Sequence, residues 1–318
     1  MNSYPNIPGP TTGSDLSLAR LLEQLRQHHN DAICCALLYG SCLRNGNIYD
    51  GLLDLYLICD TYREAYHQPL LAASNWLLPP NVFYAELKPG DGIPENKALH
   101  CKVTVISLRD FQRGCSRAWF QSYIWGRFAQ PTHIAYSRDE KTRAAVEDSL
   151  LQAGRTLLRN AIPALPTQGR LDQLWEQSLA LSYTTELRSE RSDRRAGELA
   201  QFSRDFYRTM TGYHAASLGF GFTLHENGGE LHYQSQVGKI RHIWSRLAWS
   251  LRRIQGKLLS ILRLIKALFT FEGGLDYIAW KLERHSGEKI VIPDKVRRAP
   301  LIFLWGFSWD LYRRGLFK

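Results

Sequence analysis

The sequence predicts an α+β protein in which a small mixed sheet is followed by a mostly helical part and a C-terminal amphipathic region. Short apolar runs separated by turn residues occur before residue 110, which is typical of strands. From residue 139 onward the apolar residues recur at helical spacing. The stretch 231–271 contains no Asp or Glu and combines basic with apolar residues. We therefore expect three regions, over residues 1–135, 136–235 and 236–318.

Composition restricts the class of partner. The chain has 318 residues, a formal net charge of +10 and a pI near 9.4, which favours an anionic partner, either nucleic acid or an anionic membrane surface. Nine Trp residues favour a membrane boundary, where Trp and Tyr are enriched. All six cysteines precede residue 116 and none forms a Cys-x-x-Cys pair, so they are expected to be buried thiols in a reducing compartment.

The first region is expected to alternate strands and helices. Residues 1–14 are expected to be a flexible lead-in to a helix over 15–29. The expected strands are 32–39, 52–59, 82–87 and 100–107. A helix is expected over 63–75, and another from Ser107 toward the segment 123–131. The second region is expected to contain helices over 141–158, 171–187 and 196–218, ending at a break at 227–229.

The turn after the first strand has the features of an anion site. Gly40 lets the backbone approach a phosphate closely, and Ser41 offers a hydroxyl and an amide where a helix can begin. Two-residue alternation in the next strand places Asp54, Tyr56 and Asp60 on one face, so Asp54 would face the phosphate. A carboxylate repels a triphosphate unless Mg²⁺ lies between them. The pattern therefore predicts a Mg²⁺-dependent nucleotide site with Asp54 as a metal ligand.

The second metal ligand and the phosphate-neutralising cation are harder to assign. Asp60 lies six residues along the strand, about 20 Å from Asp54, so the two cannot share an ion. Glu86, on the next expected strand, is the better second ligand. Lys102 interrupts the apolar strand 100–107. It is either a solvated outward side chain or, on the face shared with Asp54, a residue that meets the phosphates.

Several short blocks occur in an order that resembles a known family. These blocks are Tyr39-Gly-Ser41, Leu53-Asp54 in an apolar strand, Val82-Phe-Tyr84, Lys102 with Val105-Ile-Ser107, and Tyr123 to Arg127 followed by Pro131. Together they are similar to the translocator assembly and maintenance family of phosphatidate cytidylyltransferases, in the nucleotidyltransferase superfamily. The resemblance covers about residues 32 to 220. One departure is Tyr56, which stands where the superfamily usually has a second carboxylate.

The resemblance implies a nucleotidyltransferase fold and transfer of CMP from CTP to phosphatidic acid, giving CDP-diacylglycerol and pyrophosphate, with Mg²⁺ as cofactor. It implies catalytic roles for Asp54 and Lys102. The residues implied to contact CTP or wall its site are Gly40, Ser41, Arg44, Tyr123, Gly126 and Arg127. Two alternatives remain: a nucleotidyltransferase acting on a small molecule, RNA or protein, and a catalytically inactive membrane scaffold, which Tyr56 suggests.

A basic amphipathic helix is expected over residues 239–269. Its apolar residues share one face and its basic residues the other, a composition typical of helices lying in an anionic membrane interface. The alternative is a helix with a basic surface packed on the helical region; nucleic-acid binding is not expected, because the apolar face would then have no role. The aromatic tail 301–309 would enter the headgroup boundary or cap the core. These features predict a cytoplasmic protein, peripheral on the inner face of a membrane, and leave its oligomeric state open.

Overall fold

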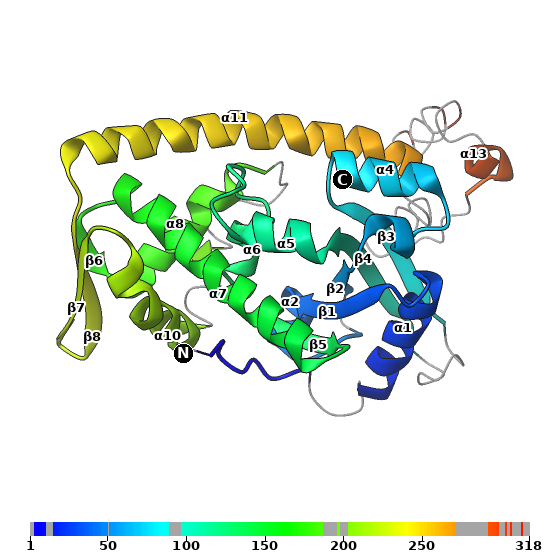
Figure 1. Cartoon of the computed structure of the whole chain (residues 1–318), viewed down its shortest axis with the longest axis horizontal. Helices are drawn as coiled ribbons and strands as arrows, with labels where there is room; N and C mark the ends of the chain where they lie inside the picture. Colours follow the sequence, from blue (N-terminus) through cyan, green and yellow to red (C-terminus); the bar gives the residue numbers. More distant parts are fainter. Residues whose placement is uncertain are drawn as a thin grey trace.

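The computed structural model describes residues 3–10, 15–49, 51–88, 97–186, 196–197, 203–270 and 292–298, together with 303, 306 and 313. A five-stranded mixed sheet lies beside a group of helices, and one long helix, α11 (Lys239–Thr270), extends along both (Figure 1). The expected combination of a mixed sheet with a largely helical remainder is confirmed. Much of the third expected region, including most of the tail 301–309, lies outside the described residues.

The sheet contains the four expected strands and one more. Its order is β3 (Asn81–Leu87), β4 (Leu99–Ser107), β2 (Leu52–Cys59), β1 (Ile33–Tyr39) and β5 (His133–Ser137). Strands β2 and β4 are parallel, and all other neighbouring pairs are antiparallel. The unexpected strand β5 crosses the expected boundary at residues 135 and 136, so the sheet continues into the second region.

The two faces of the sheet belong to two hydrophobic clusters. Tyr56 and Ile58 lie in one cluster, whereas Leu55 and Leu57 lie in the other, because successive side chains of a strand point to opposite faces. The first face is covered by α5 (Leu108–Cys115), α6 (Trp125–Phe128) and α7 (Glu140–Ala161). The second face is covered by α1 (Asp15–His28), α3 (Tyr62–Ala65) and α4 (Pro69–Leu77). The helices that follow β2 and β4 therefore lie on opposite faces.

The helical region contains a small sheet that the sequence pattern did not predict. Its strands, in spatial order, are β6 (Gln168–Arg170), β8 (Glu230–Gln236) and β7 (Gly221–Asn227). The expected break at 227–229 is the hairpin turn between β7 and β8, where Gly228 and Gly229 have φ of 60° and 80°. Two glycines supply these positive φ values without the steric cost of a Cβ. Residues 231–236 are therefore strand, and the amphipathic helix begins only at residue 239.

The expected helices of this region are present with shifted bounds. They are α7, α8 (Leu171–Tyr183) and α10 (Arg204–His214), which a 3₁₀ turn, η2 (Ala215–Ser217), continues. A second 3₁₀ turn, η1 (Ile162–Ala164), follows α7, and a short helix, α13 (Asp294–Arg298), lies near the C-terminus. Part of the expected helix 196–218, residues 198–202, lies outside the described residues. The expected helix 63–75 is instead two helices, α3 and α4, with Pro69 in the first turn of α4, where its missing N–H costs nothing.

The expectation of a flexible lead-in is wrong for residues 3–10. Tyr4 is buried, and its hydroxyl donates to the carbonyl of Gln130 (3.4 Å) and accepts from the amide of Thr132 (3.1 Å). The Ile7 carbonyl lies 2.8 Å from Nδ1 of His133. Tyr4 belongs to the same cluster as the first sheet face and the buried residues of α7, α8 and α10. The first two expected regions thus share one core.

The expectation that the cysteines are buried thiols is confirmed. All six are buried and none forms a disulfide. Burial raises the pKa of Cys34 to about 11 and that of Cys35 to about 12, which keeps both as neutral thiols. They therefore act as small apolar residues of the core.

Residues 239–270 form one helix, α11, and its apolar face points away from the protein. Arg252 is only 7% exposed; its Nε donates to the Phe120 carbonyl (2.9 Å) and its Nη2 to Oδ1 of Asn160 (2.8 Å). Lys266 donates to the carbonyls of Leu78 (2.6 Å) and Pro80 (2.8 Å). The exposed apolar residues, called here the α11 stripe, are Ile240, Ile243, Trp244, Leu247, Leu251, Ile254, Leu258, Ile261, Leu262, Leu264 and Ile265. Basic residues thus attach this helix to the protein.

None of the helices in the described part of the chain is both long enough and apolar enough to cross a membrane. The α11 stripe is apolar on one side of the helix only.

Substitution of Gly256 can test how closely α11 packs against the segment that contains Thr185. A Cβ at this position would lie 2.3 Å from the carbonyl oxygen of Thr185, so Gly256→Ala should destabilise the protein by about 1–3 kcal/mol through overpacking. Gly212, inside α10, is the matched control, because a Cβ there meets nothing within 4 Å. Gly212→Ala should stabilise by about 0.4–1 kcal/mol. Urea denaturation of both variants measures the difference; equal effects would contradict the close docking of α11.

Candidate functional site

The predicted site residues Asp54 and Lys102 lie side by side in the sheet. Strand register pairs Asp54 of β2 with Tyr39 of β1 on one side and with Lys102 of β4 on the other, and Lys102 pairs in turn with Tyr84 of β3. Neighbouring strands are about 4.8 Å apart, so these four residues form one row on one face, called here the Asp54 row. Within the described residues, neither Asp54 nor Lys102 forms a hydrogen bond or an ion pair. Their charged groups are therefore available to a ligand.

Gly40 is held directly against Asp54. It has φ 90° and ψ −157°, a conformation that side chains rarely adopt, and a Cβ there would lie 2.6 Å from Oδ2 of Asp54. The helix α2 (Ser41–Asn45) begins at the next residue, with Gly40 as its N-cap. The predicted turn and the predicted carboxylate are therefore in contact, and only glycine fits between them.

A buried arginine closes one side of this row. Nη1 of Arg127 donates to the hydroxyl of Tyr39 (3.0 Å), and Nη2 forms an ion pair with Glu186 (3.2 Å). The two charged side chains are only 10% and 14% exposed. Arg127 therefore acts on the Asp54 row through Tyr39, and its own charge is largely balanced by Glu186.

Tyr123 lies between two guanidinium groups. The Cζ of Arg127 is 4.6 Å from the centroid of its ring, and that of Arg263, from α11, is 4.1 Å away. Burial acts to raise the pKa of the phenol, but Arg127, Lys102 and Arg263 act in the opposite direction and the resulting pKa is lowered. Lys102 is thus electrostatically connected to this part of the site.

Arg263 was not among the predicted site residues. Nη2 of Arg263 donates to Oε1 of Gln121 (2.7 Å) and its Nε to the Pro79 carbonyl (3.3 Å), which fixes the guanidinium over Tyr123. In the sequence it is one of several basic residues on an amphipathic helix. Periodicity alone could not distinguish it from its exposed neighbours.

Three predicted residues are not part of the Asp54 row. Gly126 is buried against α8, where a Cβ would be 2.7 Å from Cβ of Ser182, so it allows two helices to approach. Arg44 lies near Tyr207 of α10, where its charge opposes the larger effect of burial, which raises the pKa of that phenol. Glu86 is exposed and pairs with His100, which lies two residues before Lys102 on β4, so Glu86 is one strand further from Asp54 than Lys102 is. The structure does not bring it beside Asp54.

Asp54 is the predicted site residue whose position suits a protein ligand for Mg²⁺. Mg²⁺ is commonly held by one or two carboxylates together with substrate phosphates and waters, so an unpaired carboxylate beside the Gly40 turn fits this ion. Tyr56, at the position of the usual second carboxylate, is fully buried and packs edge-on against Phe128 at 4.9 Å. No group of three or more His, Cys, Asp or Glu side chains suited to a metal occurs in the described part of the chain.

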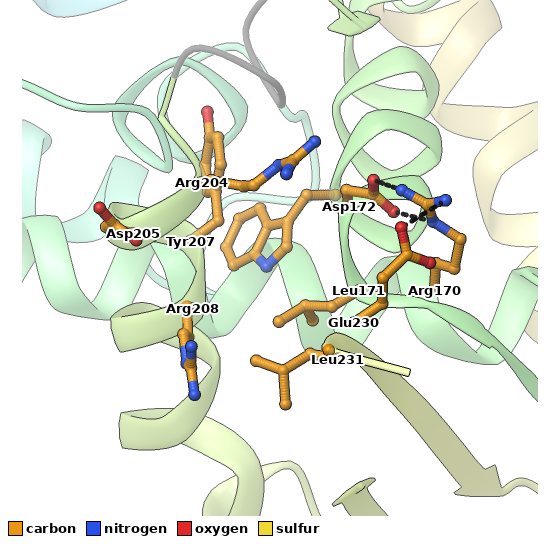
Figure 2. Close-up of a pocket in the computed structure, with 11 residues that line it drawn as sticks. Arg170, Leu171, Asp172, Arg204, Asp205, Tyr207, Arg208, Glu230 and Leu231 are labelled. Atoms are coloured by element: carbon orange, nitrogen blue, oxygen red, sulfur yellow. Dashed lines mark hydrogen bonds and ion pairs between the residues drawn. The ribbon is translucent and has the colours of Figure 1, made fainter. Parts of the chain in front are cut away.

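A separate pocket of about 130 Å³ lies between α8, α10 and β8 (Figure 2). Arg170 forms ion pairs there with Asp172 (2.5 Å) and Glu230 (2.9 Å), and Trp175 stacks on Tyr207 with ring centroids 4.5 Å apart. None of the predicted site residues lines this pocket. Much of its wall is thus occupied by contacts that join α8 to β8 and α10.

No protein-family model matches the chain, and no curated protein matches it either. Function is therefore argued from the geometry of the Asp54 row and from the orientation of α11.

Breaking the pair Arg127–Glu186 should be strongly destabilising. Arg127→Met keeps much of the side-chain volume but removes the buried guanidinium that faces the largely buried Glu186 carboxylate, so we expect a loss of about 3 kcal/mol. The control is Arg138→Met, because Arg138 pairs with Asp60 at 2.6 Å while both side chains are partly exposed (45% and 35%). That variant should lose less than about 1 kcal/mol. Chemical denaturation at pH 7 compares them, and losses of similar size would contradict the burial argument.

Proposed function

We propose that the chain is a nucleotidyltransferase that transfers CMP from CTP to phosphatidic acid at an anionic membrane surface, in the class of phosphatidate cytidylyltransferases that its motifs resemble. The observation that supports this most directly is the contact of Gly40 with Asp54, beside Lys102, which pairs with no other described residue. A backbone turn that accepts no side chain, a free carboxylate and a free cation are the groups that a metal–nucleotide complex requires.

In the proposed reaction, an anionic phosphate oxygen of phosphatidic acid forms a bond to the α-phosphorus of CTP. The bond from that phosphorus to the bridging oxygen of the β-phosphate breaks, and pyrophosphate leaves with the electron pair. The attacking oxygen is already anionic, so the chain needs no general base. Its residues must instead align two polyanions.

Each residue of the row has a role in this alignment. The Gly40–Ser41 amides bind phosphate oxygens, Lys102 neutralises phosphate charge, and Asp54 would hold Mg²⁺. The metal ion would supply electrostatic stabilisation of the charge that develops on the phosphates. Arg127 and Tyr123 orient the wall of the site through Tyr39 and through the stacked guanidiniums. Arg44 and Glu86, which are not part of the row, have no direct role in this proposal.

The orientation of α11 supports a lipid acceptor. The exposed cations Arg246, Arg253 and Lys257 recur after seven and four residues, so they share one flank of the α11 stripe. An exposed apolar stripe with cations at its margin suits the headgroup boundary of an anionic membrane. A soluble acceptor would give the stripe no role, so lipid is favoured over a small molecule, RNA or protein.

The direct experiment is an incubation with labelled CTP, Mg²⁺ and liposomes that contain phosphatidic acid, followed by extraction into organic solvent. Label in the organic phase supports the proposal. CTP binding without transfer would support the inactive scaffold instead. Transfer to another acceptor would retain the nucleotidyltransferase class and replace the substrate.

Asp54→Asn should reduce turnover more than about a hundredfold, because it removes the metal-binding charge while keeping the shape of the side chain. The measurement is the rate of CDP-diacylglycerol formation at saturating Mg²⁺, with circular dichroism to verify the fold. Ser41→Ala is the comparison and should be milder, because the backbone amides remain. Full activity of Asp54→Asn would refute the site. A larger loss of rate in Ser41→Ala than in Asp54→Asn would show that the turn, and not Asp54, has the principal role.

Membrane binding should depend on the exposed cations of α11. Arg253→Gln/Lys257→Gln should lower the affinity for anionic vesicles, measured by flotation at low salt, about thirtyfold, since each basic residue near such a surface contributes about 1 kcal/mol. Arg252 is left unchanged because its guanidinium is buried. Affinity for CTP should not change.

The control is Lys141→Gln/Arg208→Gln, which removes two exposed charges from α7 and α10. It should float like the unmodified chain. Added salt should reduce vesicle binding of the unmodified chain toward that of Arg253→Gln/Lys257→Gln. Equal flotation of both variants would refute the role of the α11 flank.

A further inference from the structure

A groove of about 1070 Å³ lies at the end of the parallel strand pair. Strands β2 and β4 end beside each other at Cys59 and Ser107, and the helices that follow them lie on opposite faces of the sheet. Adjacent parallel strands whose next helices diverge leave a crevice outside their carboxyl ends, the place where open α/β sheets bind ligands. The volume corresponds to the upper end of the usual range for ligand sites.

One wall of the groove has excess positive charge. Arg63 of α3 and Arg109 of α5 form no hydrogen bond or ion pair with any described residue, and Arg113 lies one turn beyond Arg109. The acidic groups are already engaged. Both oxygens of Asp60 accept from Arg138 (2.6 and 3.0 Å), and Asp110 accepts from the hydroxyl of Tyr62 (2.8 Å). Asp110 also lies 3.8 Å from Nη1 of Arg113, so an anion would meet two guanidinium groups, those of Arg63 and Arg109, that pair with no described carboxylate.

The opposite wall is apolar. Pro69, Ala72, Ala73 and Trp76 of α4 line it, and the Trp76 side chain is 73% exposed. On the same helix Leu70 and Leu77 are also exposed. The groove therefore presents a cationic side and an apolar side to a single ligand.

This groove is distinct from the Asp54 row. Asp54 and Asp60 are separated by six residues of β2, which spans about 20 Å. A ligand in the groove cannot contact the Gly40 turn. The two places therefore can be tested independently.

We propose that this groove binds a phosphate monoester that has an apolar substituent. The phosphate lies against Arg63, Arg109 and Arg113, and the substituent lies against the α4 wall. The same chemistry is offered by the headgroup of an anionic lipid and by a soluble organic phosphate. The proposal does not depend on nucleotidyl transfer.

The test is calorimetric titration of the full chain with hexyl phosphate, with inorganic phosphate as a second probe. Arg109→Gln/Arg113→Gln should weaken hexyl phosphate binding at least tenfold, because two charge-assisted contacts are lost. Trp76→Ala should weaken hexyl phosphate binding and leave inorganic phosphate unchanged. Two variants are controls and should bind normally: Asp54→Asn, and Arg117→Gln/Lys141→Gln, which removes two exposed charges outside the groove.

Vesicle sedimentation distinguishes the two sources of the ligand. A preference for vesicles with phosphatidic acid over vesicles with phosphatidylglycerol, lost in Arg109→Gln/Arg113→Gln, supports a lipid headgroup. Hexyl phosphate binding with no such preference supports a soluble organic phosphate. Loss of binding in Asp54→Asn but not in the arginine variant would overturn the proposal, as would no binding to the unmodified chain. The proposal would also be overturned if hexyl phosphate and inorganic phosphate bound equally well and Trp76→Ala changed the affinity for neither.

Discussion

The contact between Gly40 and the carboxylate of Asp54 is the constraint on which the candidate site depends. The backbone at Gly40 adopts φ 90°, and no Cβ fits between it and Oδ2 of Asp54. The antiparallel pairing of β1 with β2 places Asp54 opposite Tyr39, directly before this turn, and the parallel pairing of β2 with β4 places Lys102 on its other side. Turn, carboxylate and cation are therefore set by strand register, which no movement of a single side chain can undo.

Helix α11 departs from the usual rule that an amphipathic helix buries its apolar face. Burying Arg252 and Lys266 requires that their charges be compensated, and each donates to main-chain carbonyls while Arg252 also donates to Asn160. Burial lowers the pKa of Lys266 to about 7, with Arg263 acting in the same direction, so this residue can lose its charge near neutral pH. The helix is held by directional polar contacts, while the α11 stripe stays available to another apolar phase.

The sequence predicted those features that depend on local patterns. Apolar runs located four of the five strands of the main sheet, and two-residue alternation placed Asp54 on the correct face for Lys102. It did not predict β5 or the hairpin β7–β8; in the hairpin, β7 is mostly exposed and each strand contains too few apolar residues to give a strand pattern. The position of Glu86 was also not predictable, since the register of β3 depends on its pairing with β4.

The orientation of α11 marks a second limit of pattern analysis. A period of 3.6 residues shows which side chains share a face, but not whether that face points inward. Here the buried contacts of Arg252 and the stacking of Arg263 on Tyr123 decide the orientation, and both depend on residues more than 90 positions earlier in the chain. The same contacts connect the helix to the wall of the candidate site. If the α11 stripe lies on a membrane, as proposed, the surface that supplies the lipid acceptor is attached to Tyr123 through a single helix. A lipid acceptor would then reach the Asp54 row along a wall that the membrane-bound helix itself positions.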